Sequence, residues 1–201
     1  AALYTTGLLQ VRSHNERGLR WLIDLLTKNF PYEMMKPQQD LRVLLQDFIQ
    51  PMAQTSLSVK DYAHAFEDVR LCTSLLLGAL ERQSSGVNIL VWGIPGAGKT
   101  ELAKMIAAQL HAQLLEVCPQ DAEGAPISAS QRIRNFSVAQ KFYADKPCLL
   151  LFDECEEVMA SRNEFSHVAE GETVPRKSWI NKTLETNAIP TIWISNSVDA
   201  F

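Results

Sequence analysis

Residues 93–100 read Gly-Ile-Pro-Gly-Ala-Gly-Lys-Thr. This spacing is that of the phosphate-binding loop, G-x-x-x-x-G-K-[ST]. An apolar segment at 87–92 comes directly before the loop, and a stretch with Leu102, Ile106 and Leu110 in helical phase follows it. A strand, a glycine-rich loop and a helix in this order are the setting that the motif requires, so this stretch predicts the local fold as well as a phosphate site.

The glycines and the lysine of such a loop have separate roles. Glycines let the backbone curl around a phosphate without Cβ clashes, and N–H groups that turn inward bind anionic oxygens. The helix that starts here adds the positive end of its dipole. The motif predicts that Lys99 reaches the β- and γ-phosphates of a nucleotide and that the Thr100 hydroxyl ligates Mg²⁺. The predicted nucleotide contacts are Gly93, Ile94, Pro95, Gly96, Ala97, Gly98, Lys99, Thr100 and Glu101.

Short apolar runs recur along the second half of the chain, at 87–92, 114–118, 148–152 and 191–195. Runs of this length that are apolar throughout are typical of parallel strands buried on both faces. Helical stretches separate them, and a further helix is predicted over residues 59–83, after Ser58 as its cap. Strands that alternate with helices predict an α/β fold with a parallel sheet.

Two of the predicted strands end in polar side chains. Asp153 and Glu154 follow the third run, and Asn196 follows the fourth. Because α/β proteins bind ligands beyond the carboxyl ends of their parallel strands, these side chains are expected beside the glycine-rich loop. Asp153 is predicted to hold Mg²⁺, and Glu154 to accept a proton from an attacking water. Asn196 can orient that water through its amide, or it simply starts a turn.

Composition narrows the class of protein. The chain has 201 residues, of which 46% are hydrophobic and 21% charged, with a net charge of −4. This is globular composition, and it gives no general attraction to nucleic acid or to an anionic membrane. No apolar run reaches the roughly 18 residues of a membrane-spanning helix. The four cysteines, interpreted as small buried hydrophobes in a reducing compartment with a zinc site or disulfide as the alternative, are Cys72, Cys118, Cys148 and Cys155.

Residues 1–56 are predicted to form a helical segment in front of a nucleotide-binding core at 57–201. Apolar residues fall in helical phase from Leu19 to Leu26, after a capping-box sequence, and again over residues 40–50, where Pro51 is expected to end the helix. We interpret this pair as a packing appendage, with a partner-binding module as the alternative.

Three motifs together resemble the AAA+ ATPase family. GIPGAGKT at 93–100, LLLFDE at 149–154 and TIWISN at 191–196 look like its Walker A, Walker B and sensor-1 elements. The resemblance implies a P-loop αβα sandwich of three layers with a parallel sheet in the order 5-1-4-3-2. The family's fifth strand, helical lid and arginine finger would follow Phe201, which leaves the P-loop strand at the sheet edge.

The resemblance also implies a function and a set of site residues. ATP and Mg²⁺ would be the cofactors, and hydrolysis to ADP and phosphate would drive the remodelling of a macromolecule. The implied catalytic residues are Glu154, Lys99 and Asn196, and the implied metal ligands are Thr100 and Asp153. A cytoplasmic homo-oligomeric ring, such as a hexamer, is expected, with a protein partner rather than nucleic acid and no membrane. The alternatives are a slow nucleotide-gated switch or loader and, less fittingly, a P-loop small-molecule kinase.

Other features depart from the family or stay open. The region at 119–126 has two acids and none of the aromatic residues of the family's pore loop, so threading of a polypeptide is not expected. Arg162 and Arg176 are candidates for contact with a neighbouring subunit, within a polar stretch at 162–177 that is predicted as a loop. Glu156 and Glu157 are interpreted as carboxylates favoured at a helix start.

Overall fold

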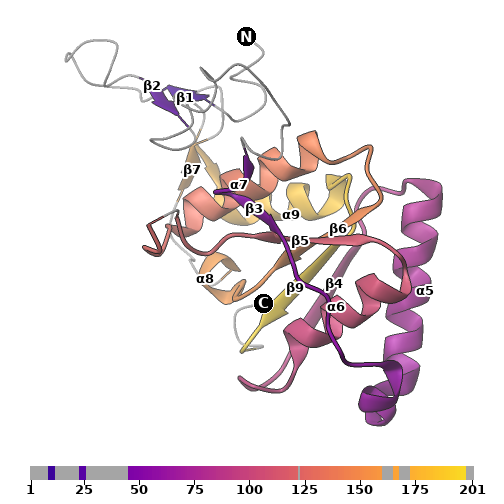
Figure 1. The fold of residues 1–201 in the computed structure, drawn as a ribbon. Helices are drawn as coiled ribbons and strands as arrows, with labels where there is room; N and C mark the ends of the chain where they lie inside the picture. Colours follow the sequence, from indigo (N-terminus) through magenta and orange to yellow (C-terminus); the bar gives the residue numbers. More distant parts are fainter. Residues whose placement is uncertain are drawn as a thin grey trace, which may run out of the picture.

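A computed structural model describes residues 9–11, 23–25, 45–121, 123–159, 165–167 and 173–197 (Figure 1). Its centre is a sheet of five strands in the order β3-β5-β6-β9-β4. The strands are β3 (Ile49–Pro51), β4 (Asn88–Trp92), β5 (Gln113–Val117), β6 (Cys148–Phe152) and β9 (Thr191–Ser195). β4, β9, β6 and β5 run parallel, and β3 runs antiparallel to β5.

The inner strands form because their residues are apolar on both faces. All five residues of β6 and all five of β9 are buried. Leu149, Leu151 and Ile192 point to one side of the sheet, while Phe152 and Trp193 point to the other. Because side chains alternate along a strand, β6 and β9 each place apolar side chains in the cores on both faces of the sheet. Both strands therefore have to lie inside the protein.

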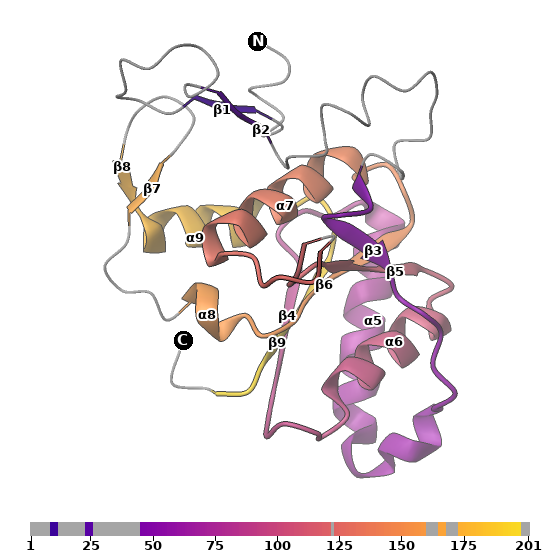
Figure 2. The same ribbon diagram turned by 60° about the vertical axis from the view of Figure 1, so that its left-hand side comes forward.

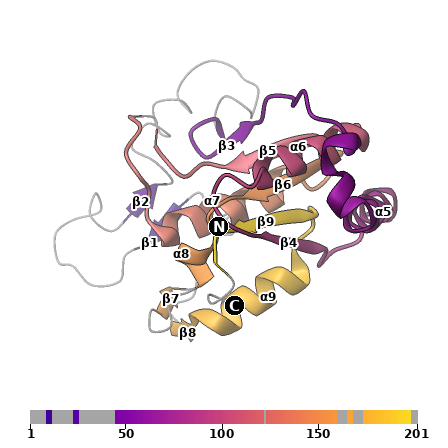
Figure 3. The same cartoon turned by 90° about the horizontal axis from the view of Figure 1, so that it is seen from below.

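Helices cover both faces of the sheet, which gives three layers. One face carries the 3-10 turn η1 (Val59–Ala65), α5 (Phe66–Arg82) and α6 (Lys99–Gln109), whose apolar residues share a core with the strands. The other face carries α7 (Ala129–Phe142), α8 (Glu156–Met159) and α9 (Arg176–Thr186). Figure 3 shows α5 and α6 on one side of the strands and α9 on the other. The P-loop αβα fold predicted from the sequence is confirmed.

The strand order agrees with the predicted order and adds one strand. Without its fifth strand, the predicted order 1-4-3-2 corresponds to β4-β9-β6-β5. The additional strand β3 makes the sheet mixed rather than purely parallel. It pairs Ile49 with Val117 and Pro51 with Leu115. Proline fits here because β3 lies at the edge, where a missing N–H is tolerated.

The prediction of a helix over residues 40–50 is therefore wrong at its carboxyl end. Among the described residues, Leu45 to Phe48 form a helical turn before β3 begins. Leu45, Phe48 and Ile49 are buried. Apolar residues at this spacing are compatible with a turn followed by a strand as well as with a helix, so the pattern does not distinguish the two. The helix predicted around residues 19–26 is also wrong at β2 (Ile23–Leu25), which pairs with β1 (Leu9–Val11). The remainder of both predicted helices lies outside the described residues.

Two further elements differ from expectation in detail. The helix predicted over 59–83 is divided into η1 and α5, with non-helical backbone angles at Tyr62. Ser58 is the N-cap residue, as predicted, and the Asp61 carboxylate reaches back to accept from its N–H, at 2.7 Å, and from its hydroxyl, at 2.9 Å. Within the stretch predicted as a loop, β7 (Phe165–His167) and β8 (Thr173–Pro175) pair as a hairpin next to α9 (Figure 2).

The P-loop strand β4 lies at the edge of the sheet, as predicted. Within the described part of the chain its one neighbour is β9. Leu90 and Trp92 are exposed there, Trp92 by 61%. The cysteines agree with their interpretation as apolar residues: Cys118, Cys148 and Cys155 are buried, and burial raises the pKa of the Cys118 thiol to about 12. No helix among the described residues is both long enough and apolar enough to cross a membrane.

Candidate functional site

The glycine-rich loop joins the end of β4 to the start of α6. Gly96 and Gly98 have φ angles of 79° and 80°, in the left-handed region that glycine adopts without steric cost. Gly98 is the N-cap residue of α6, so the first N–H groups of the helix follow the loop directly. The N–H of Gly93 donates to the carbonyl of Ser195, at 3.2 Å, and thereby fixes the loop to the end of β9.

The predicted lysine and asparagine come together at this loop. The Lys99 Nζ donates to the carbonyls of Gly93 and Ile94, at 2.7 and 2.9 Å. It also donates to the Asn196 Oδ1, at 3.0 Å. A cation in the loop and an amide at the end of β9 thus meet over the loop backbone, where the phosphates of a nucleotide are expected.

The two residues predicted to bind a metal are also neighbours. The Thr100 hydroxyl donates to the Asp153 Oδ2, at 2.9 Å, between the first turn of α6 and the end of β6. A hydroxyl and a single carboxylate match the chemistry of Mg²⁺, which keeps several waters and takes further oxygens from nucleotide phosphates. Among the described residues no group of three or more His, Cys, Asp and Glu side chains forms a complete metal site.

Glu154 occupies an exposed turn just after Asp153. Its φ angle of 50° lies in the left-handed region, which costs free energy for a residue with a side chain. Its N–H donates to the Asp153 Oδ1, at 2.8 Å. The Glu154 carboxylate is therefore open to solvent at the site while its backbone is held in an unusual conformation.

Sequence reasoning missed the part that Glu156 has in this arrangement. The Glu156 Oε1 accepts a hydrogen bond from the N–H of Asn196, at 3.2 Å, which connects α8 to the end of β9. Burial acts to raise the pKa of Glu156, but hydrogen bonds from N–H groups and from Ser195 and Asn196 outweigh it and lower the pKa. Its place at a helix start was visible in the sequence, whereas its partner on another strand was not.

A second missed contact comes from the segment before α5. The Tyr62 hydroxyl donates to the carbonyl of Gly98, at 3.1 Å, and the Thr55 hydroxyl donates to the Glu101 carboxylate, at 2.5 Å. Lys104 also binds Glu101, at 2.6 Å, and together these hydrogen bonds lower the pKa of Glu101. The Glu101 side chain thus faces Thr55 and Lys104, and its predicted nucleotide contact would use its backbone.

A third residue without an assigned role is Arg132 of α7, which is 1% exposed. Its Nη2 donates to the carbonyl of Asp153, at 2.5 Å. A signal for it exists in the sequence, because Arg132 and Asn135 fall in helical phase with the buried Phe136 and Ala139. A polar residue on the apolar face of a helix needs a partner inside the protein.

The other predicted features are the region at 119–126 and the two arginines. The region at 119–126 forms a turn closed by a bridge between Gln120 and Pro126, in which the Asp121 carboxylate accepts from the Ala125 N–H at 2.8 Å. Arg176 is the first residue of α9, and Arg162 lies outside the described residues.

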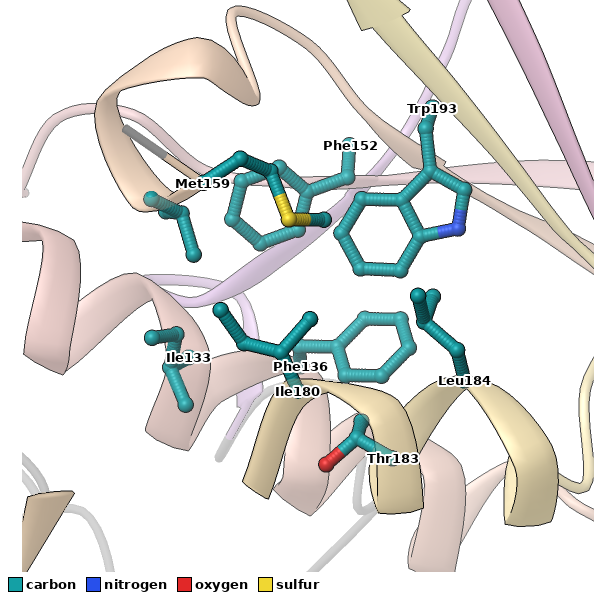
Figure 4. A pocket seen from close by; sticks show the side chains of 9 residues that line it. Ile133, Phe136, Phe152, Met159, Ile180, Thr183, Leu184 and Trp193 are labelled. Atoms are coloured by element: carbon teal, nitrogen blue, oxygen red, sulfur yellow. The ribbon is translucent and has the colours of Figure 1, made fainter. Parts of the chain in front are cut away.

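A small apolar cavity lies on the other face of the sheet, between α7, α8 and α9 (Figure 4). Phe152 and Trp193 stack there with ring centres 5.0 Å apart, and Phe136 lies against Trp193 at 5.1 Å. Thr183 is the polar side chain in its lining. The cavity belongs to the packing of this core and is separate from the glycine-rich loop.

The fold and the loop geometry define the class: this is a P-loop α/β protein. Residues 89–201 match the family described as "ATPase family associated with various cellular activities (AAA)". The match covers more than half of the chain, and the chain belongs to the AAA family. This confirms the resemblance that the three motifs indicated.

Curated relatives agree with the family. The peroxisomal ATPase PEX1 of Homo sapiens is 38% identical over 157 residues, which cover 78% of this chain and 10% of that protein. The peroxisomal ATPase PEX6 of Candida glabrata is 36% identical over 106 residues, or 52% of this chain and 10% of that protein. The ribosome biogenesis ATPase RIX7 of Saccharomyces cerevisiae is 32% identical over 78 residues, or 37% of this chain and 9% of that protein.

The chain thus spans about a tenth of the length of the curated relatives that it matches. A chain from the solved E. coli MS115-1 HORMA:CdnC:Trip13 complex has a TM-score of 0.48 and 16% identity, covering 78% of this chain and 66% of that one. A likeness at that score adds nothing to the family assignment.

Proposed function

We propose that this chain is the nucleotide-binding core of an ATPase that binds Mg·ATP and hydrolyses it to ADP and phosphate. The observation that carries the proposal is the meeting of polar groups from three strand ends at one loop. Lys99 after β4 lies 3.0 Å from Asn196 after β9, and Thr100 lies 2.9 Å from Asp153 after β6. The AAA family consists of ATPases, which supports the same conclusion.

The phosphates would bind to the loop backbone and to Lys99. Gly93 to Glu101 present N–H groups and the start of α6, which favour anionic oxygens. The Lys99 ammonium now donates to two loop carbonyls and to Asn196. When a nucleotide binds, its phosphate oxygens would replace the carbonyls and the amide as acceptors of the Lys99 ammonium. The positive charge of Lys99 would then offset the negative charge of the phosphates.

Thr100 and Asp153 would hold Mg²⁺. When bound there, the ion would supply positive charge against the charge that develops on the phosphates. The protein's own contribution is to hold a hydroxyl and a carboxylate 2.9 Å apart, at the start of α6 and the end of β6.

Hydrolysis would use Glu154 and Asn196. Glu154 is exposed at the site and would accept a proton from the attacking water. Asn196 would orient this water through its amide, while its backbone N–H is held by Glu156. The Asn196 Oδ1 accepts a hydrogen bond from Lys99. A phosphate that takes this hydrogen bond from Lys99 would free the Asn196 amide, so Asn196 would respond to bound phosphate.

The finer assignments rest on the family and on the names of relatives. We infer a homo-oligomeric ring, such as a hexamer, that remodels a protein partner in the cytoplasm. The boundary between an appendage at 1–56 and a core at 57–201 stays a prediction, and residues 45–51 pack with the core sheet through β3. The relatives carry names that refer to peroxisomes and ribosome biogenesis. The turn at 119–126 has no aromatic residue, so the proposal does not include threading of a polypeptide.

The test is Glu154→Gln in the full-length protein, with Glu81→Gln as a matched control on the exposed face of α5. We expect Glu154→Gln to lower ATP turnover by a factor of about 10² to 10⁴ and to leave the affinity for Mg·ATP unchanged. Glu81→Gln should change neither. Turnover in Glu154→Gln equal to that of the wild type would remove Glu154 from the mechanism.

Turnover should also be measured against protein concentration. A specific activity that rises with concentration would support a ring whose subunits complete each other's sites. Tight Mg·ATP binding with negligible turnover at all concentrations would favour the nucleotide-gated switch instead. A phosphorylated small molecule appearing together with ADP would favour the kinase.

A further inference from the structure

Arg132 is a buried cation that lies directly behind the turn at Asp153 and Glu154. Its side chain is 1% exposed. Its guanidinium lies over the ring of Phe152, the last residue of β6, with 4.3 Å between the guanidinium carbon and the ring centre. Burying a charge costs several kcal/mol unless hydrogen bonds and opposite charges compensate, so the contacts of this group are informative.

Its hydrogen bonds go to the backbone of two consecutive site residues. The Nη2 donates to the carbonyl of Asp153, at 2.5 Å, and the Nη1 reaches the carbonyl of Glu154, at 3.5 Å. The first contact is short and the second is at the limit of a hydrogen bond. The planar fork of arginine can serve two neighbouring acceptors in this way, whereas a lysine offers a single point charge.

The backbone that receives these hydrogen bonds needs support. Glu154 has a φ angle of 50°, a conformation that costs about 1–3 kcal/mol for a residue with a side chain. Such a conformation persists where surrounding contacts impose it. Arg132 supplies one such contact on the carbonyl side, and the Cys155 N–H supplies another by donating to the carbonyl of Ile194, at 2.9 Å.

The charges around Arg132 fit the same role. Burial lowers its pKa, and the carboxylates of Glu157, Glu154, Asp153 and Glu116 act in the opposite direction. Arginine stays protonated in proteins, so a positive charge faces the acidic groups of the site from within the core. Its Nε has no partner within the described chain, so its hydrogen bonding is directed to the turn.

We propose that Arg132 is a positioning residue for hydrolysis: it fixes the backbone of Asp153 and Glu154 and so holds the Glu154 carboxylate where the attacking water binds. This inference rests on the proposed role of Glu154. A purely structural role, in which Arg132 only packs on Phe152, is the alternative to be separated from it.

Phe136 provides the matched control for that separation. It belongs to the same helix, is also 1% exposed, and packs on the same ring, with 6.1 Å between the Phe136 and Phe152 ring centres. It makes no polar contact with the turn. Phe136→Leu should therefore weaken the core about as much as Arg132→Met does, without releasing the backbone of Glu154.

The experiment compares Arg132→Met, Arg132→Lys and Phe136→Leu in the full-length protein, through kcat and KM for ATP and the Kd of a non-hydrolysable ATP analogue. We expect Arg132→Met to lower kcat by about 100-fold, the size of a small misplacement of a reacting group, with KM and Kd nearly unchanged. Arg132→Lys should recover part of kcat, and Phe136→Leu should keep the wild-type kcat.

Equal losses of kcat in Arg132→Met and Phe136→Leu would overturn the proposal. If Arg132→Met does not fold, a folded Arg132→Lys with wild-type kcat would overturn it as well.

Amide hydrogen exchange separates this inference from the proposed function. We expect exchange at Cys155 to become about tenfold faster in Arg132→Met, the equivalent of one lost hydrogen bond to a charged group, and to stay unchanged in Phe136→Leu. This measurement needs no turnover. A wild-type protein without turnover would refute the proposed function, while unchanged exchange in Arg132→Met would refute the role of Arg132.

Discussion

The amino end of β9 is closed by neutral amides, while its carboxyl end is surrounded by charged groups. At the amino end, Asn187 is 3% exposed and Thr191 is fully buried. The Asn187 Nδ2 donates to the carbonyls of Ile189 and Val87, at 2.8 and 3.2 Å. The Asn88 Nδ2 donates to the Asn187 Oδ1, at 3.0 Å. Gln140 of α7 adds a hydrogen bond from the Ile189 N–H, at 2.7 Å. Every contact here joins one neutral group to another.

The carboxyl end differs in charge and in exposure. Within the part of the chain that the structure describes, Lys99 donates to neutral acceptors, and Glu154 is an exposed carboxylate. Arg132 is buried behind them. Neutral amides that hydrogen-bond inside the protein keep the strands in register. A charged side chain whose hydrogen bonds go to neutral acceptors can exchange those acceptors for a ligand of opposite charge. Polar residues at a strand end therefore indicate a ligand site when charge remains uncompensated.

The largest expected effect comes from removing the charge of Lys99. Lys99→Ala should weaken the binding of Mg·ATP by about 100-fold, because two charge-assisted hydrogen bonds to phosphate are worth about 3 kcal/mol together. Titration with a fluorescent ATP analogue would measure this. Lys182→Ala on the exposed face of α9 is the control and should leave the affinity unchanged. Equal affinity in Lys99→Ala and the wild type would mean that the loop does not hold the phosphates.

An intermediate effect, on stability alone, is expected at the amide end. Asn187→Ala removes three hydrogen bonds, to the Asn88 amide and to the carbonyls of Val87 and Ile189, although each of these groups keeps another partner. At roughly 1 kcal/mol for each lost bond, this should cost about 2–3 kcal/mol in the free energy of unfolding. For a domain of this size, Tm should fall by roughly 5–10 °C. Asn181→Ala, on the exposed side of α9, which ends just before Asn187, is the control and should change Tm little. The comparison would break if Asn187→Ala lowered nucleotide affinity at a temperature where the protein stays folded.

The same contrast explains what the sequence could predict. The strands β6 and β9 have the predicted bounds, because the apolar residues at 148–152 and at 192–194 leave few other options for such short runs. The glycine-rich loop and the pair Asp153 and Glu154 are local patterns, and the structure places them side by side. β3 was not predictable in this way, because Ile49 fits a helical phase equally well and its partner Val117 lies far along the chain.

Contacts between side chains and distant backbone were also out of reach. Nothing near Arg132 in the sequence indicates that it would reach the carbonyl of Asp153. Glu156 likewise contacts Asn196 only once two strands lie together. Local sequence thus predicts the groups that would carry the chemistry, and the groups that hold them follow from tertiary packing.

The smallest expected effect concerns Glu116 of β5, opposite Leu151 of β6. Burial raises the pKa of Glu116, and the Asp153 carboxylate adds to this, while Arg132 and Lys104 act against it. A carboxyl whose pKa is higher in the folded protein than in the unfolded chain lowers stability once it is ionised. The cost is absent well below the ordinary glutamate pKa of 4.5 and complete above the raised folded pKa. The charged groups gathered at the carboxyl end of the sheet therefore lower the stability of the folded protein, whereas the neutral amides at the other end do not.

Glu116→Gln should accordingly stabilise the protein at pH 7.5. Solvent screening keeps the gain within about 1 kcal/mol, so Tm should rise by no more than roughly 2–4 °C. The difference from the wild type should shrink as the pH falls towards 4.5, because the wild-type carboxyl then becomes neutral as well. Glu123→Gln, in the exposed turn at 119–126, is the control and should show no such dependence on pH. A lower Tm for Glu116→Gln at pH 7.5 would mean that the ionised Glu116 is stabilised by Arg132 and Lys104 more than burial and Asp153 oppose it, and that the charges at this end are balanced after all.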